Sequence, residues 1–178
     1  HFGLLVGQYI TLQSFGVAGR IARNAPSVGA ALQDLAAFFV LHDSGGSVRV
    51  AIHDGRVTLG YGIHVPGMKH SDQVYDLAVA ALANVMRQLG GTDWRPDAVL
   101  LPRKRPTDIR PYREHFAAPL RFNSIMAAVV FPEPGVPAGA ELAIKMWQLL
   151  VDERSRHPLA TDVLGDLAWF PAARLNLI

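Results

Sequence analysis

The residue types that most often perform catalysis or bind metals are present, but they are scattered. The seven histidines fall one at a time on different expected elements, and none stands at ligand spacing from another histidine or a carboxylate. The chain contains no nucleophile elbow, dinucleotide-binding turn, Walker loop, zinc-protease motif or calcium loop. The carboxylates Asp34, Asp72, Asp76 and Asp108 fit helix starts or exposed faces. The sequence therefore predicts no catalytic residue, no metal site and no cofactor.

A basic run is the one concentration of charge. Arg103-Lys104-Arg105, with Arg110 and Arg113 downstream, could attract an anion or a phosphate backbone. A short run between two prolines more often forms a solvated loop, and the net charge of the chain is only +2. We therefore expect a solvated loop here, and no grip on DNA by this segment alone.

Composition indicates one folded domain in 178 residues. Half of the residues are hydrophobic, 18% are charged, and every apolar run is interrupted before it could cross a bilayer. The absence of cysteine excludes disulfides and thiolate chemistry and fits a reducing cytoplasm. The start lacks a methionine, so we expect the sequence to be a piece of a longer protein.

One helix, expected over Ser71–Gly91, organises the rest. Apolar side chains recur on one stripe, at Val74, Leu77, Ala78, Ala81, Leu82, Val85 and Leu89. Ser71 is the expected N-cap, and Gly90-Gly91 is the expected left-handed stop. The opposite side is also apolar and small, with Val79, Ala80 and Ala83. This helix therefore needs neighbours on two sides.

A β-hairpin is expected immediately before that helix. Asp54-Gly55 between alternating patterns predicts a tight turn, which pairs Ile52 with Val57, Val50 with Leu59 and Val48 with Tyr61 on one core face. The other face contains Arg49, Ala51, His53, Arg56, Thr58, Gly60, Gly62 and His64. That face suits either solvent or the close approach of a ligand or helix.

The remaining elements follow from shorter patterns. We expect helices over Phe15–Ala25, Ser27–Phe39, Asp108–Phe116 and Ala140–Arg156, a buried strand at Ala98–Leu101, an antiparallel pair of Leu120–Phe122 with Ala127–Phe131, and a linker at Gly135–Gly139.

A family resemblance rests on three stretches in order along His1–Gly139. They are Phe2–Gly7 (FGLLVG), the segments Phe15–Gly19 and Asn24–Leu32, and Pro111–Phe131 (PYREHFAAPLRFNSIMAAVVF). Together they resemble the N-terminal effector-binding, arabinose-binding-like domain of AraC-type transcription regulators. The sequence departs from the family pattern at Gly29-Ala30, where an acidic residue is usual, and in a shortened Pro/Gly-rich region after Phe131. No helix-turn-helix follows Arg156.

The resemblance implies an α/β (α+β) domain, with a twisted, mostly antiparallel sheet and helices packed against it. It also implies a sensor domain over residues 1–157 that binds a small-molecule effector. Residues 158–178 would then be a tail or linker toward a DNA-binding domain outside this sequence. Homodimerisation, action in the cytoplasm and the absence of membrane contact belong to the same expectation.

Six residues are predicted to bind the effector. Tyr61, His64 and Tyr75 surround the loop between the hairpin and the central helix; Arg49 and Arg121 could neutralise a carboxylate, and Trp147 could supply an aromatic wall. Each also has a purely structural interpretation, as a core or exposed strand residue.

Two other functions stay open. A dimerisation module would bury the alanine-rich face of Ser71–Gly91, or the helix Ala140–Arg156, between two chains. A small-molecule enzyme would bring together acidic or basic groups that are distant in the sequence.

Overall fold

The chain folds as a five-stranded sheet covered by helices, and the computed structural model describes residues 1–68 and 70–133. In chain order the elements are α1 (Phe2–Gly7), the 3-10 turn η1 (Leu12–Phe15), α2 (Gly16–Arg23), α3 (Val28–Phe38), the 3-10 turn η2 (Phe39–Leu41), β1 (Gly46–His53), β2 (Arg56–Ile63), α4 (Asp72–Gly90), β3 (Ala98–Leu101), α5 (Arg110–Phe116), β4 (Leu120–Phe122) and β5 (Ala127–Pro132). The linker 135–139, the helix 140–156 and the boundary at 157/158 lie outside the described residues.

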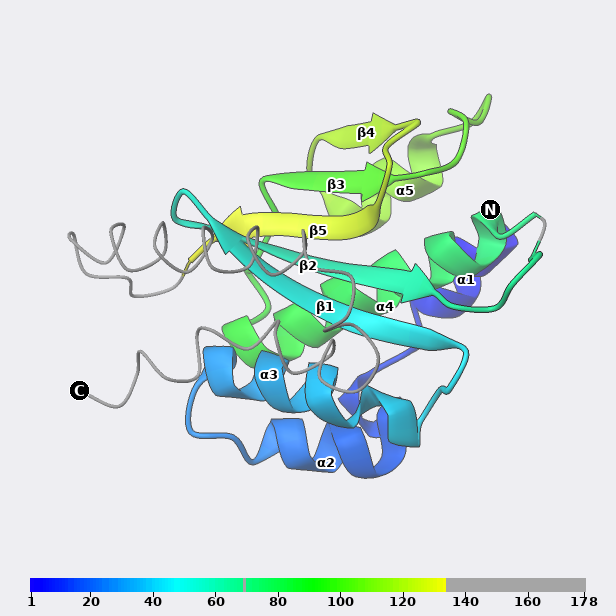
Figure 1. Cartoon of the computed structure of the whole chain (residues 1–178). Helices are drawn as coiled ribbons and strands as arrows, with labels where there is room; N and C mark the ends of the chain where they lie inside the picture. The colour runs from blue at the N-terminus through cyan, green and yellow to red at the C-terminus, as the bar shows by residue number, and fades with distance from the viewer. Residues whose placement is uncertain (69, 134–178) are drawn as a thin grey trace.

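The sheet has the strand order β1-β2-β5-β3-β4 (Figure 1). Every neighbouring pair is antiparallel except β3 and β4, which run parallel. Helix α3 packs on β1, whereas α4 packs on β2, β5 and β3, and their buried side chains form one core. The predicted α/β class with a mostly antiparallel sheet is confirmed.

The hairpin β1–β2 has the predicted register. Val48 lies opposite Tyr61, Val50 opposite Leu59 and Ile52 opposite Val57. The turn residues Asp54 and Gly55 both have positive φ, 49° and 69°, as a two-residue turn with the twist of the strands requires.

The predicted pairing of Leu120–Phe122 with Ala127–Phe131 is wrong. Strand β3 lies between the two segments and pairs with both. The four residues that link them do not close a hairpin, because Asn123 N–H donates to Arg103 O at 2.9 Å and Ser124 N–H donates to Leu101 O at 3.1 Å. These bonds attach the loop to the end of β3, so β4 forms the far edge of the sheet.

Helix α4 is buried on two sides, as its composition predicts. One side faces the sheet and the other faces α1 (Figure 1). Val79, Ala80 and Ala83 on the second side are all 0% exposed. A dimer interface through this alanine-rich face is therefore excluded, because α1 already covers it.

Glycine lets α1 approach α4 closely. A Cβ at Gly3 would lie 1.8 Å from the backbone oxygen of Gln73, and one at Gly7 would lie 2.5 Å from that of Leu77. Asn84 extends the contact, since its Nδ2 donates to the backbone oxygen of Gly7 at 3.1 Å and to two further carbonyls after α1. The end of α1 is thus satisfied by a side chain of α4.

The two predicted serine caps differ in outcome. The Ser27 hydroxyl accepts from Ala30 N–H at 3.1 Å and caps α3 as predicted. Ser71 precedes α4 but its side chain makes no capping hydrogen bond, so that prediction is wrong.

Among the described helices, none combines the length and the apolar character needed to cross a membrane.

The close approach of α1 gives a testable prediction. Gly3→Ala should lower the free energy of unfolding by about 2 kcal/mol, because the new methyl group meets rigid backbone of α4. Gly62→Ala is the matched control, since its Cβ would find nothing nearer than 3.7 Å. Urea unfolding of both variants measures the difference, and equal midpoints would contradict the packing.

Candidate functional site

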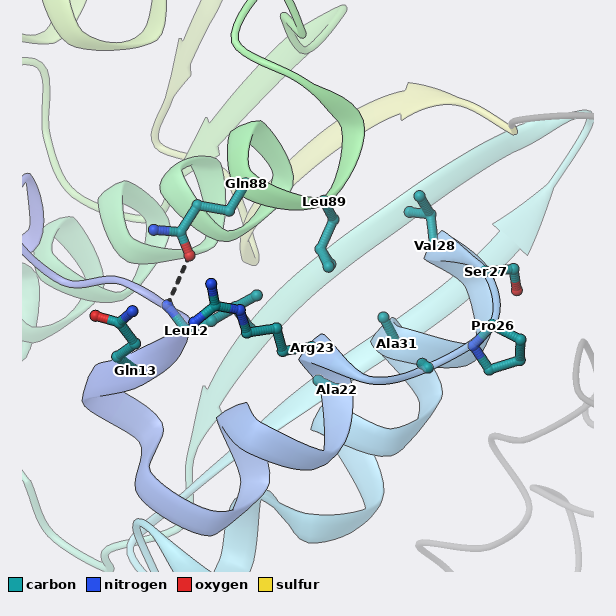
Figure 2. A pocket seen from close by; sticks show the side chains of 11 residues that line it. Leu12, Gln13, Ala22, Arg23, Pro26, Ser27, Val28, Ala31, Gln88 and Leu89 are labelled. Carbon is teal, nitrogen blue, oxygen red and sulfur yellow. Dashed lines mark hydrogen bonds between the residues drawn. The ribbon is translucent and has the colours of Figure 1, made fainter.

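A hollow of about 560 Å³ lies where the end of α2, the start of α3 and the end of α4 meet (Figure 2). Its lining residues are Leu12, Gln13, Ala22, Arg23, Ala25, Pro26, Ser27, Val28, Ala31, Gln88 and Leu89. That volume is within the range of pockets that bind small molecules.

The hollow exists because the chain turns sharply between α2 and α3. Helix α2 ends just before Pro26, which has no N–H to continue it, and the Asn24 side chain donates to Arg20 O at 2.8 Å at that end. Helix α3 then starts in a new direction with Ser27 as its cap. Alanines at the positions that face the hollow leave the space between the helices unfilled.

One end of the hollow is rich in hydrogen-bond donors. Leu12 N–H donates to Gln88 Oε1 at 2.9 Å, so the amide nitrogen of Gln88 is left to donate elsewhere. Arg23 is the one charged residue in the lining, and it makes no hydrogen bond or ion pair within the described residues. Figure 2 shows the side-chain ends of Gln13, Arg23 and Gln88 grouped on the same side of the hollow.

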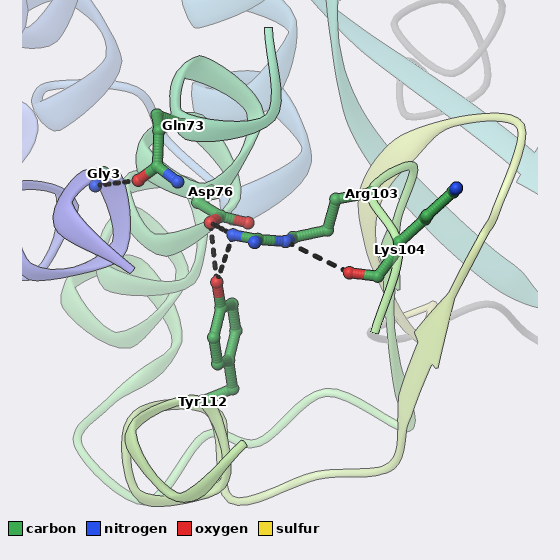
Figure 3. Close-up of polar contacts among 6 residues, drawn as sticks. All are labelled: Gly3, Gln73, Asp76, Arg103, Lys104 and Tyr112. Atoms are coloured by element: carbon green, nitrogen blue, oxygen red, sulfur yellow. Dashed lines mark hydrogen bonds and ion pairs between the residues drawn. The ribbon is translucent and has the colours of Figure 1, made fainter. Parts of the chain in front are cut away.

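A second polar group, Asp76 with Arg103 and Tyr112, lies inside the fold. Tyr112 Oη donates to Asp76 Oδ2 at 2.6 Å, and Arg103 forms an ion pair with the same oxygen and donates to Tyr112 Oη at 2.7 Å (Figure 3). Asp76 is 1% exposed, and its other oxygen, Oδ1, makes no hydrogen bond with a described residue. This group joins α4, the segment after β3, and α5.

Burial and pairing act against each other in this group. Desolvation raises the pKa of Asp76, while the hydrogen bond from Tyr112 and the charge of Arg103 oppose that rise. Burial alone would lower the pKa of Arg103, but the Asp76 carboxylate outweighs it and raises that pKa. Desolvation and the bond to Asp76 raise the pKa of Tyr112. The group is an ion pair with a neutral tyrosine, which suits a structural link between elements.

Two sequence predictions fail at this group. Asp76 was expected on a helix start or exposed face, but it is buried because it accepts from Arg103 and Tyr112. Arg103 was expected in a solvated loop, but only 13% of its side chain is exposed. The neighbouring Lys104 and Arg105 are exposed, as predicted.

The predicted binding residues are divided by the sheet. Tyr61 and Tyr75 lie on the core side, with ring centroids 6.4 Å apart, and Tyr61 Oη donates to Asp43 at 2.8 Å. Desolvation, then the bond to Asp43, raises the pKa of Tyr61 well above its usual range. Arg49 and His64 lie on the other side, where both contact the hydroxyl of Ser47, at 3.3 and 2.7 Å.

The last two predicted residues stand apart from those groups. Arg121 is exposed on the edge strand β4, and Trp147 lies outside the described residues. The structure therefore joins the six residues into two pairs rather than one site.

Sequence patterns could not have shown the hollow. Gln13, Arg23 and Gln88 belong to three different elements, and their periodicity marks them only as the polar sides of helices. No group of three or more His, Asp or Glu suited to a metal ion occurs in the described part of the chain.

Comparison with known proteins identifies the class. The profile of the arabinose-binding domain of AraC transcription regulators, N-terminal, matches residues 1–135. The HTH-type transcriptional regulator VirS of Mycobacterium tuberculosis, in strains CDC 1551 and H37Rv, is 28% identical over 124 residues. That alignment covers 68% of this chain and 36% of VirS.

A solved structure has the same fold. The transcriptional regulator CdpR from Pseudomonas aeruginosa superposes with a TM-score of 0.60 at 24% identity, over 74% of this chain and 43% of CdpR. The chain belongs to the AraC-type N-terminal domain family and is a regulatory domain of that non-enzymatic family. It spans well under half the length of the relatives it matches.

The buried ion pair gives a second prediction. Arg103→Gln should lower the free energy of unfolding by about 3–5 kcal/mol, because it leaves the Asp76 carboxylate buried without its cation. Arg105→Gln, an exposed change of the same kind in the same run, should have no measurable effect. Urea denaturation of the two variants measures both free energies of unfolding. Equal decreases in the two variants would contradict a specific role for Arg103.

His115 gives a prediction about pH. Desolvation, together with the charge of Arg87, lowers the pKa of His115 from 6.5 to about 4. The folded state therefore resists protonation of this ring, so its contribution to stability is present above pH 6.5 and is lost as the pH falls toward 4.

The free energy of unfolding should fall by about 1–2 kcal/mol over this pH range, because of the pKa shift of His115. This is less than the full pKa shift of His115 implies, because its ring keeps partial contact with water. His115→Gln should remove that part of the pH dependence, while the same change at the exposed His53 should not. Unfolding free energies measured between pH 7 and 4.5 test this, and parallel curves for wild type and His115→Gln would refute it.

Proposed function

We propose that this domain senses a small-molecule effector in the hollow between α2, α3 and α4. Through this sensing it controls a DNA-binding domain elsewhere in the full-length regulator, which acts in the cytoplasm where its DNA is. The observation that supports the proposal is a pocket of ligand size within a domain of the AraC-type arabinose-binding family.

The position of the hollow suits a sensor. A ligand there contacts helices α2 and α3, which follow one another in the chain, and also the end of α4, which belongs to the core. Binding adds contacts between these parts and so favours the arrangement in which they are close. A sensor requires such a difference in affinity between two arrangements.

A second position for the effector is the pair Tyr61 and Tyr75 predicted from the sequence. Two aromatic rings next to a hydrogen-bonded carboxylate, Asp43, provide both apolar surface and polar contacts. A ligand at this pair would not reach Arg49 and His64, which lie on the other side of the sheet, or Arg121, which lies on its far edge. Contact of these three residues and of Trp147 with an effector stays a prediction. The hollow is the stronger candidate because it already has free volume.

A homodimer is compatible with effector binding and is part of the proposal. The alternative is a domain that only dimerises, with no ligand. Since α1 covers the alanine-rich face of α4, such a dimer would have to use another surface.

Thermal unfolding tests the proposal. The 178-residue chain is screened against amino acids, sugars, fatty acids and other metabolites, and one chemical class should raise the melting temperature in a saturable way. Val28→Trp, which fills the hollow from its half-buried wall, should abolish the shift, whereas Val40→Trp, at a 64% exposed position away from it, should retain it.

Two other results would each contradict one part of the proposed function. A shift that survives Val28→Trp but is lost in Tyr75→Ala would move the site to the Tyr61–Tyr75 pair. A chain that dimerises at micromolar concentration and is stabilised by no compound would overturn the sensor function in favour of the dimerisation module.

A further inference from the structure

We infer that the ligand of the hollow is an aliphatic carboxylate, whose anionic head binds Arg23 and whose chain lies on the apolar wall. This inference rests on the proposed function, since it names the ligand class of the same hollow. It follows from the charge, the hydrogen-bond capacity and the surface of the lining residues.

The charge of the lining is positive. Arg23 is its one ionisable residue, and no aspartate or glutamate contributes to the wall. Within the described residues the guanidinium has no acceptor, although it offers five N–H donors. Arg23 is exposed, so water solvates its guanidinium in the absence of a ligand. A cationic ligand would be repelled here, and an anion would take the place of that water.

The hydrogen-bond capacity at that end is one-sided. The oxygen of Gln88 is occupied by Leu12 N–H, so Gln88 offers its amide nitrogen. The ends of Gln13 and Arg23 lie on the same side of the hollow (Figure 2). Donors outnumber free acceptors, which is the arrangement that a carboxylate, with two acceptor oxygens and no donor, satisfies.

The rest of the wall contains mostly apolar side chains, with Ser27 as its polar member. Leu12, Ala22, Val28, Ala31 and Leu89 belong to this part, and Figure 2 places Leu89 between the donor-rich end and the start of α3. A hydrocarbon chain excludes water from this surface, whereas a sugar would leave hydroxyl groups facing it without partners. The combination favours a carboxylate with an aliphatic chain over a polyhydroxylated compound.

The adjacent surface provides an internal comparison. Arg20 lies one turn earlier on α2, but it lines a separate, more open hollow together with Asp34. That second hollow contains both signs of charge. Substitution of Arg20 therefore serves as a control for a general attraction of anions to α2.

Calorimetric titration of the 178-residue chain with sodium octanoate, 1-octanol and octylamine tests the inference. Octanoate should bind at least about tenfold more tightly than either neutral or cationic analogue, because it alone satisfies Arg23. Arg23→Gln should weaken octanoate binding by about tenfold or more and leave octanol unchanged, while Arg20→Gln should change neither. Melting temperatures of the variants without ligand show that both are folded.

The outcomes separate this inference from the proposed function. If octanol or octylamine binds as well as octanoate and Val28→Trp abolishes that binding, the hollow is the effector site but the carboxylate inference is wrong. If Arg23→Gln binds octanoate as wild type does, the inference is likewise wrong. If octanoate binding survives Val28→Trp, or no compound of any class binds, the proposed effector site itself fails and the inference fails with it.

Discussion

The fold depends on the burial of polar backbone at the start of the chain against one helix. Buried N–H and C=O groups need partners, and α4 supplies them through its amide side chains. Gln73 accepts from Gly3 N–H at 2.8 Å, Asn84 donates to the carbonyls after α1, and Gln88 accepts from Leu12 N–H. These bonds place the N-terminal segment along the whole length of α4. The sheet occupies the other side, so Val74 is the one large apolar side chain of α4 that stays exposed.

Local patterns determined the parts of the fold that the sequence predicted well. The turn Asp54-Gly55 sets the register of β1 and β2, and a register error of one residue would have exposed Leu59, which is 0% exposed. The apolar composition of α4 likewise predicts neighbours on two sides. In both cases residues close in the sequence determine the outcome, so one sequence is enough to predict it.

Pairings between distant segments were beyond such patterns. Asp76 looks like a surface residue until Arg103, 27 positions later, and Tyr112 are placed beside it. Strand β4 looks like half of a hairpin until its loop is seen to bond to the end of β3. The hollow is the extreme case, because its donors come from η1, α2 and α4 and none is unusual for a polar helix face. Three of the residues predicted to bind ligand, Tyr61, His64 and Tyr75, were expected around one loop, but the sheet places His64 with Arg49 on one side and the two tyrosines on the other.

The same amide side chains connect the hollow to the core. Gln88 is both a wall of the hollow and the acceptor for Leu12 N–H, so a ligand that bonds to its amide nitrogen orients the group that holds the N-terminal segment. A ligand shared between Arg23 and Gln88 would also join α2 to α4 directly, through contacts that the described residues do not make themselves. Binding would then stabilise the docking of the helical corner on α4 by RT ln(1 + [L]/Kd). Since a ligand shifts an equilibrium only by its difference in affinity for two states, the proposed effector would act through this corner of the domain.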